Sequence, residues 1–294
     1  MLVLLLVLAP LSGAAKTPKK ANVSANFVRV QRDENGPQSL QLAVHRYHAG
    51  NATVDLVGAV HVGEKSYYQQ LNREFKNYDA VLYELIASSE DAGGRPIPVA
   101  GDVDNPLSMV QNGLKNMLGL TFQLDHIDYS PANFVHADIS PQEFEKSMQK
   151  KGESFRTIFM RLLQAGMDSP STVTDEEIAE MDLLGIFLKG PSPRDQIILR
   201  RLLADSFSDL DAMGAALEGP GGSTLISVRN QKAMAVLQQQ VKKGKKKLAI
   251  FYGVAHMPDM STRLQKLHFQ HDGVHWLSAW DLRLKPKTKP AKKG

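Results

Sequence analysis

The chain has 294 residues, 43% of them hydrophobic, which allows one large or two small folded domains. It contains no cysteine, which excludes disulfides, thiolate metal sites and cysteine nucleophiles, so any chemistry must use histidine, carboxylates, serine or a metal held by nitrogen and oxygen. The net charge is +4, but two basic runs at 242–247 and 285–294 hold ten lysines, so the rest of the chain carries −6. The chain has no basic helix of the kind that binds nucleic acid, and nucleic-acid binding is not expected.

The chain opens with a short apolar run, MLVLLLVLAPLSGAA at residues 1–15, which ends in small residues. This pattern is typical of a signal peptide and predicts a secreted or periplasmic protein. No Lys or Arg precedes the run, so an uncleaved segment that anchors the protein is the alternative. A polar linker is expected at 16–26. After the signal, no run reaches the ~18 apolar residues that a membrane-spanning helix needs.

Three short strands separated by turn residues are predicted at 27–32, 39–47 and 54–60. A helix is expected at 66–78, where apolar residues recur at helical spacing, and a strand at 79–85. Strand, helix and strand in this order are typical of a parallel sheet, in which ligand-binding residues lie at the carboxyl ends of the strands.

The middle of the chain is predicted to be a long loop followed by a helical insertion. Gly, Pro and Asp are frequent at 88–113, which indicates a lid or an irregular excursion. A short strand at 132–140 runs into a helix with a capped start, and helical periodicity then fills about 141–219.

The C-terminal part returns to strands. GPGGS at 219–223 ends the insertion, and one more helix leads into the strand KLAIFYG. A helix at 260–267, a strand at 274–282 and a solvated basic tail at 285–294 are expected to follow. These elements predict one domain at 27–284 of the α/β class, with α+β as the alternative, built on a central mixed β-sheet flanked by helices.

One junction occurs twice in the chain. VDLVGAVHVG and AIFYGVAHMP each run an apolar strand into Gly-x-x-His, at Gly58 and His61 and again at Gly253 and His256, with the same offset of 195 residues. Glycine permits a close approach of another backbone or a ligand, and a histidine just past a strand end lies where pockets of α/β sheets form. If the two strands are neighbours in one sheet, both imidazoles face one cavity.

Glu84 interrupts the apolar run AVLYEL, near the carboxyl end of the strand that follows His61. A buried carboxylate needs a partner, and two histidines with one carboxylate are common ligands of divalent metals. We therefore expect a Mn, Co or Zn site of His61, His256 and Glu84, whose ion activates water and polarises a carbonyl for hydrolysis. The alternatives are hydrogen-bonded structural histidines and a salt-bridged glutamate at a sheet edge.

Other polar residues stand near the predicted site. Asp138 ends FVHAD and is a candidate ligand, orienter of a histidine or helix N-cap, of which the last two are favoured. Arg229 and Asn230 begin the helix before the second junction, where the arginine can grip a substrate carboxylate, stabilise an oxyanion or form a plain salt bridge. Ser66 and Ser261 lack the Gly-x-Ser-x-Gly elbow and are expected to start helices.

Five segments follow one another along the chain: LVGAVHVGEKS, YDAVLYEL, FVHADIS, VRNQKAM and FYGVAHMPDM. In this order they resemble the TraB/PrgY/GumN family. That family includes the Tiki metalloproteases and is distantly related to erythromycin-esterase-like and ChaN-like proteins. The resemblance implies an α/β core with a helical insertion and a metal-dependent, peptidase-like activity. It implies His61, Glu84 and His256 as the metal set, Arg229 and Asn230 lining the site, and Gly58 and Gly253 shaping its floor. Where the family often has an Asp-Arg pair, this chain has Asp138 and Ile139.

The sequence thus predicts an exported metal-dependent hydrolase that acts on a peptide or another small molecule. The residues assigned to catalysis are His61, Glu84, His256 and Arg229, and those assigned to substrate binding are Asn230, Gly58, Gly253 and Asp138. The alternative is a binding protein without turnover that holds a peptide or haem in the same cleft, with Tyr83 beside Glu84 as the feature that favours haem.

Overall fold

The computed structural model describes residues 26–87, 115–153, 173–207 apart from 180 and 182, 214, 217 and 222–284. The predicted signal peptide, the loop at 88–113 and the basic tail lie outside these residues, as do nearly all of the linker and parts of the helical insertion. No helix in the described ranges is both long and apolar enough to cross a membrane.

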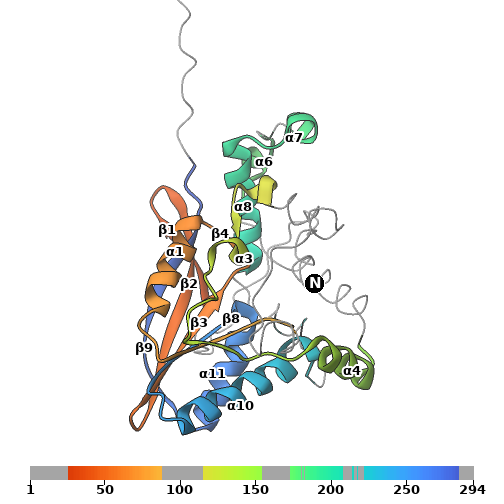
Figure 1. Cartoon of the computed structure of the whole chain (residues 1–294). Helices are drawn as coiled ribbons and strands as arrows, with labels where there is room; N and C mark the ends of the chain where they lie inside the picture. Colours follow the sequence, from red (N-terminus) through yellow and green to blue (C-terminus); the bar gives the residue numbers. More distant parts are fainter. Residues whose placement is uncertain are drawn as a thin grey trace, which may run out of the picture.

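A seven-stranded mixed β-sheet forms the centre of the fold (Figure 1). Its strands are β1 (Val28–Asp33), β2 (Gly36–Ala49), β3 (Ala52–Ala59), β5 (Ala80–Tyr83), β7 (Phe134–His136), β8 (Lys247–Gly253) and β9 (Gln270–Asp281). The strand order is β1-β2-β3-β8-β5-β7, and β9 pairs with β2. The predicted α/β class and mixed sheet are therefore confirmed.

The sheet has an antiparallel half and a parallel half. β1, β2 and β3 form a meander, and β9 runs antiparallel to β2. β3, β8, β5 and β7 are parallel. β8 comes last of these four in the sequence, yet it lies between β3 and β5, which belong to the first third of the chain. Parallel neighbours end at the same edge of the sheet, which is where both Gly-x-x-His junctions are found.

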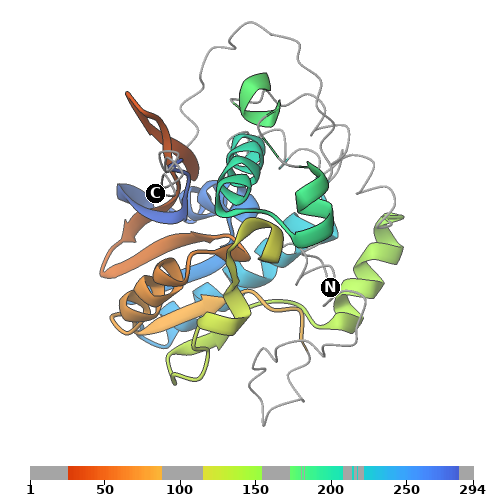
Figure 2. The same cartoon turned by 90° about the horizontal axis from the view of Figure 1, so that it is seen from above.

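The helices cover both faces and one end of the sheet. They are α1 (Lys65–Phe75), α3 (Gln123–His126), α4 (Pro141–Lys151), α6 (Asp175–Ala179), α7 (Leu183–Lys189), α8 (Pro193–Phe207), the π-helix η1 (Thr224–Val228), α10 (Arg229–Lys242), the 3-10 helix η2 (Val254–His256) and α11 (Met257–Lys266). In Figure 1, α6 and α7 lie above the sheet and α8 lies beside its upper end, away from α10 and α11. α4 lies at the edge of the molecule in both views (Figures 1 and 2).

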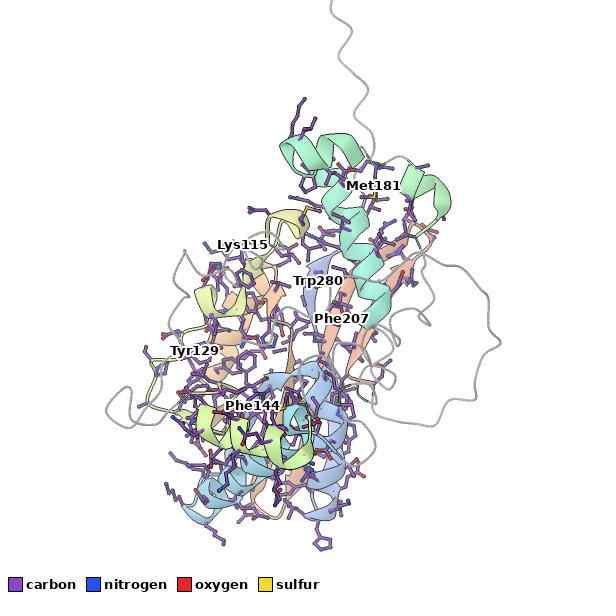
Figure 3. The ribbon with its side chains drawn as sticks, turned by 90° about the vertical axis from the view of Figure 1, so that its right-hand side faces the viewer. Lys115, Tyr129, Phe144, Met181, Phe207 and Trp280 are labelled. Carbon is purple, nitrogen blue, oxygen red and sulfur yellow. The ribbon has the colours of Figure 1, made fainter. Side chains whose placement is uncertain are left out.

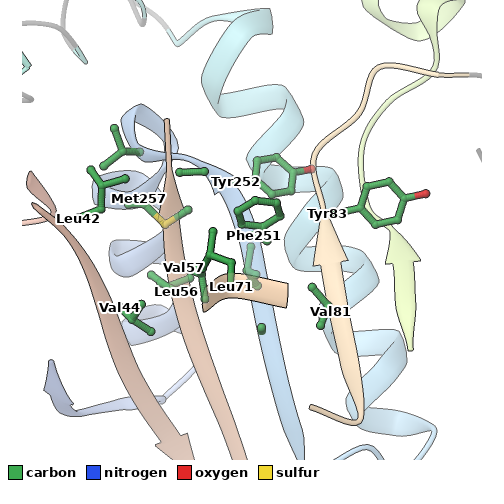
Figure 4. Packing of buried hydrophobic residues seen from close by; sticks show 14 of the residues in the cluster. Leu42, Val44, Leu56, Val57, Leu71, Val81, Tyr83, Phe251, Tyr252 and Met257 are labelled. Carbon is green, nitrogen blue, oxygen red and sulfur yellow. The ribbon is translucent and has the colours of Figure 1, made fainter. Parts of the chain in front are cut away.

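The core is built by strand alternation, which turns successive side chains to opposite faces. On β8, Phe251 contacts Phe75 of α1, with ring centroids 4.9 Å apart. The next residue, Tyr252, is also fully buried and donates its hydroxyl proton to the carbonyl of Ala137 at 2.6 Å. Figure 4 shows Leu71 of α1 in front of the strands, on the same face of the sheet as Phe251. Burial on both faces explains why the sequence of β8 is almost entirely apolar.

Helix α8 of the insertion is fastened to the sheet. Phe207 packs edge-on against Trp280 of β9, with ring centroids 5.5 Å apart (Figure 3). The buried guanidinium of Arg200 donates to the carbonyls of Leu118 at 2.6 Å and Gly119 at 2.8 Å, and to Glu64 at 2.7 Å. The described part of the insertion therefore shares the polar contacts and the core of the main sheet.

Of two predicted helix starts, that of α4 agrees with the structure and that of α11 differs. α4 has the expected capped start, because Ser140 and Glu143 form a capping box. α11 begins at Met257, directly after His256, rather than at residue 260. Ser261 consequently lies inside α11 and not at its start. Its hydroxyl group forms a hydrogen bond with the hydroxyl group of Tyr47 at 2.8 Å.

A small second sheet was not predicted. β4 (Val62–Gly63) pairs antiparallel with β6 (Thr121–Phe122). Two-residue strands carry no periodicity that sequence can reveal. The pairing nevertheless matters, because it brings the chain after β6 against the first Gly-x-x-His junction.

Candidate functional site

The parallel pairing of β3 with β8 places the two junctions side by side. Ala59 is the register partner of Gly253, and His61 and His256 follow at the same edge. Glu84 follows β5, the other neighbour of β8, and its backbone N–H donates to the carbonyl of Phe251 at 3.2 Å. Three distant parts of the sequence therefore deliver one side chain each to this edge.

Gly253 lies between the three side chains. A side-chain carbon built on Gly253 would lie 3.2 Å from Glu84 Oε2, 3.7 Å from His256 Cδ2 and 3.8 Å from His61 Nε2. The missing side chain thus leaves a small space above Gly253 that the two rings and the carboxylate surround. We call this space the Gly253 cradle.

The Glu84 carboxylate is held in a fixed position. Its Oε1 accepts from Arg229 Nη2 at 2.6 Å, and its Oε2 accepts from the backbone N–H of Gly253 at 2.5 Å. Burial alone raises the pKa of Glu84. The charge of Arg229, the charge that His256 and His61 carry when protonated, and the hydrogen bond from Gly253 outweigh burial and keep this pKa below its ordinary value. Glu84 is therefore an anion at neutral pH.

Hydrogen bonds fix the tautomer of His256. Asn230 Nδ2 donates to Asp259 Oδ2 at 2.7 Å and to the backbone carbonyl of His256 at 3.1 Å, and both of these oxygens are acceptors. The amide oxygen of Asn230 must then face His256 Nδ1, 2.6 Å away, which has to carry the ring proton. Nε2 of the neutral ring keeps its lone pair and lies 3.6 Å from Glu84 Oε1.

Both rings of the site are neutral. Burial lowers the pKa of His256 to about 4, although the Glu84 carboxylate opposes the shift. Burial also lowers the pKa of His61, again against the effect of Glu84. Neutral imidazole is the form that binds metal ions or accepts a proton.

Arg229 and Asp138 form a buried pair. The guanidinium binds Asp138 through Nε at 2.9 Å and Nη2 at 2.6 Å, and the arginine side chain is only 5% exposed. Asp138 therefore neither orients a histidine nor caps α4, whose N-cap is Ser140. Arg229, held between Asp138 and Glu84, is placed to hold Glu84 and not to reach out to a substrate carboxylate.

The remaining predicted residues have different places. Asn230 is fully buried and contacts His256, so it supports the ring and does not line a surface. Gly58 faces Val254 and Met257, 3.2 Å and 3.6 Å from an added side-chain carbon, and so allows close packing, whereas Gly253 forms the floor of the site. Tyr83 is fully buried in an aromatic cluster with Tyr129 and is not exposed to bind haem.

Sequence reasoning missed two residues of the site. Asp259 follows the second junction directly and orients Asn230, and its place three residues after His256 was the available signal. Gln123 begins α3, and its backbone N–H donates to the carbonyl of His61 at 2.9 Å. No local pattern marks Gln123, since only the β4–β6 pairing brings it to His61.

The donors suit a divalent ion in kind. Two neutral imidazoles and one carboxylate form a common ligand set, and the Gly253 cradle leaves room among them. As the side chains stand, no three His, Asp or Glu groups within the described ranges are already arranged to hold an ion.

Comparisons with protein families, with curated proteins and with solved structures found no match to this chain.

Proposed function

We propose that this protein is a metal-dependent hydrolase of peptide bonds, with His61, Glu84 and His256 as the residues that hold the ion. The observation that supports the proposal is the meeting of these three groups around the Gly253 cradle. The His256 Nε2 lone pair and Glu84 Oε1 lie 3.6 Å apart with no proton of either group between them. Two acceptors in this arrangement attract a cation.

A divalent ion held by these residues would polarise the carbonyl of a substrate and activate water. The chain supplies the surroundings. Arg229 keeps Glu84 ionised and aimed at the cradle, while Asn230 keeps the lone pair of His256 on Nε2. Gly253 donates its N–H to Glu84 Oε2, which fixes the second carboxylate oxygen. The similarity of the five segments to the TraB/PrgY/GumN family favours a peptide substrate over other carbonyl compounds.

The test uses the purified full chain, stripped of metal with EDTA. Mn²⁺, Co²⁺ and Zn²⁺ are titrated separately, and bound ion, melting temperature and cleavage of a peptide library are measured. We expect one ion to bind and to raise the melting temperature, since a ligand of the folded state stabilises that state by about 2.7 kcal/mol at a hundred times its Kd. Cleavage should appear with the same ion.

Variants His61→Ala, His256→Ala and Glu84→Gln should each lose ion affinity and turnover, by more than the roughly 10–100-fold that follows loss of a residue supporting a ligand. His136→Ala is the control, because His136 ends β7 at the same edge but bonds the carbonyl of Leu85. Ion binding and turnover that persist in all three site variants would refute the proposal.

A further inference from the structure

Gln123 has the features of an overlooked part of the site. Its side chain is buried, at 6% exposure, although glutamine is usually found at the surface. Its Nε2 donates to the hydroxyl of Tyr129 at 2.8 Å, which anchors the amide. Its Oε1 is buried and has no hydrogen-bond partner. An unpaired buried carbonyl costs free energy and calls for an explanation.

The His61 ring is the group that this oxygen can serve. The β4–β6 pairing and the bond from the Gln123 backbone N–H to the His61 carbonyl hold the two residues together. The oxygen of an amide can only accept, so Gln123 Oε1 can pair with a ring nitrogen only where that nitrogen carries a proton. His61 Nε2 lies near the Gly253 cradle, so Nδ1 is the nitrogen left for Gln123.

We infer that Gln123 is a positioning residue that accepts the Nδ1 proton of His61 and thereby directs the Nε2 lone pair into the Gly253 cradle. It is the counterpart of Asn230, whose amide oxygen faces His256 Nδ1. Histidines that bind metals generally donate their second ring N–H to such an acceptor, which fixes the tautomer. The benefit of this arrangement for ion binding rests on the proposed function, whereas the tautomer itself does not.

The test reads the tautomer directly by NMR. Full-length protein with ¹⁵N-labelled histidine is studied without metal at about pH 8, where an ordinary histidine is neutral. Long-range correlations from ring protons to ring nitrogens show which nitrogen carries the proton, and the His61 signals are assigned by their loss in His61→Ala. We expect Nδ1–H for His61 in the wild type.

Two variants separate this role from a structural one. Gln123→Met keeps the side-chain length but removes the acceptor, and should shift His61 toward Nε2–H while His256 keeps its tautomer. Gln123→Glu restores an acceptor and should restore Nδ1–H. Affinity for the ion should fall roughly 10–100-fold in Gln123→Met and recover in Gln123→Glu.

An Nε2–H ring in the wild type, or an unchanged tautomer in Gln123→Met, would overturn the inference. These readings need neither metal nor turnover. Wild-type protein that shows the expected tautomers and binds no ion would therefore support the role of Gln123 while refuting the proposed metal-dependent function.

Discussion

Gly253 and Gly58 occupy the same position in the repeated junction but have different structural roles. Gly58 makes room for Val254 and Met257, so its missing side chain serves packing. Gly253 makes room beside Glu84 and both rings, so its missing side chain serves the site. The two glycines occupy equivalent positions in the sequence pattern, and only their surroundings in the fold distinguish them.

Gly253→Ala should therefore weaken ion binding without unfolding the protein. The backbone of Gly253, at φ −50° and ψ 137°, is open to alanine, but the added carbon would lie 3.2 Å from Glu84 Oε2. We expect at least a roughly 10-fold loss of affinity, comparable to loss of a supporting residue, and little change in melting temperature. Isothermal titration calorimetry with the ion that binds the wild type measures the affinity.

Gly58→Ala is the matched control for this prediction. It adds the same carbon at the equivalent position, 3.2 Å from Val254 Cγ2, and should cost stability through overpacking while affinity for the ion is kept. Equal loss of affinity in both variants would contradict the role of Gly253.

At the scale of elements, the site depends on how strands and helices are fastened together. β8 brings His256 between β3 and β5, and η1 leads into α10 so that Arg229 and Asn230 reach the strand ends. A π-helix at this position is uncommon, and such turns occur often beside functional sites. α8 is joined to the rest of the fold by the buried side chains of Arg200 and Arg201 and by the contact of Phe207 with Trp280.

Arg200→Leu should destabilise the protein by about 3 kcal/mol, because it leaves Glu64 and three backbone carbonyls without their donor. Urea unfolding followed by circular dichroism measures the change. Arg283→Leu is the control, since the Arg283 side chain is 66% exposed and its ion pair with Asp281 lies at the surface. Equal stability of the two variants would show that the hydrogen bonds of Arg200 contribute little to the stability of the fold.

At the scale of the whole molecule, burial of histidines makes stability depend on pH. Burial lowers the pKa of His45, whose Nδ1 lies 2.9 Å from His271 Nε2, as it lowers those of His61 and His256. The unfolded chain protonates these rings below about pH 6.5, whereas the folded protein protonates them only at a lower pH. Stability should therefore be unaffected by them above that pH and fall as the pH drops below it.

Between pH 7.5 and 5.5, each fully protected histidine should reduce the free energy of unfolding by at most about 1.4 kcal/mol. Urea unfolding across this range measures the slope. In His45→Gln the slope should be shallower by the share of one histidine, whatever the absolute stability of the variant. An unchanged slope would show that His45 takes up protons equally in the folded and unfolded states.

The sequence by itself determined most elements and three of the groups at the site. The strands and α1 follow from local periodicity, and His61, His256 and Glu84 stand out because polar residues end apolar runs. The start of α11 was misplaced by three residues, since a histidine at a strand end gives no sign that helix follows at once.

The tertiary structure alone decided which residues meet. Nothing local shows that β8 inserts between β3 and β5, that Asp138 pairs with Arg229, or that Gln123 lies against His61. These contacts join segments far apart in the chain, and they depend on strand order and side-chain packing, which no short stretch of sequence contains. Local patterns thus named the candidates for the site, and long-range pairing assigned their roles.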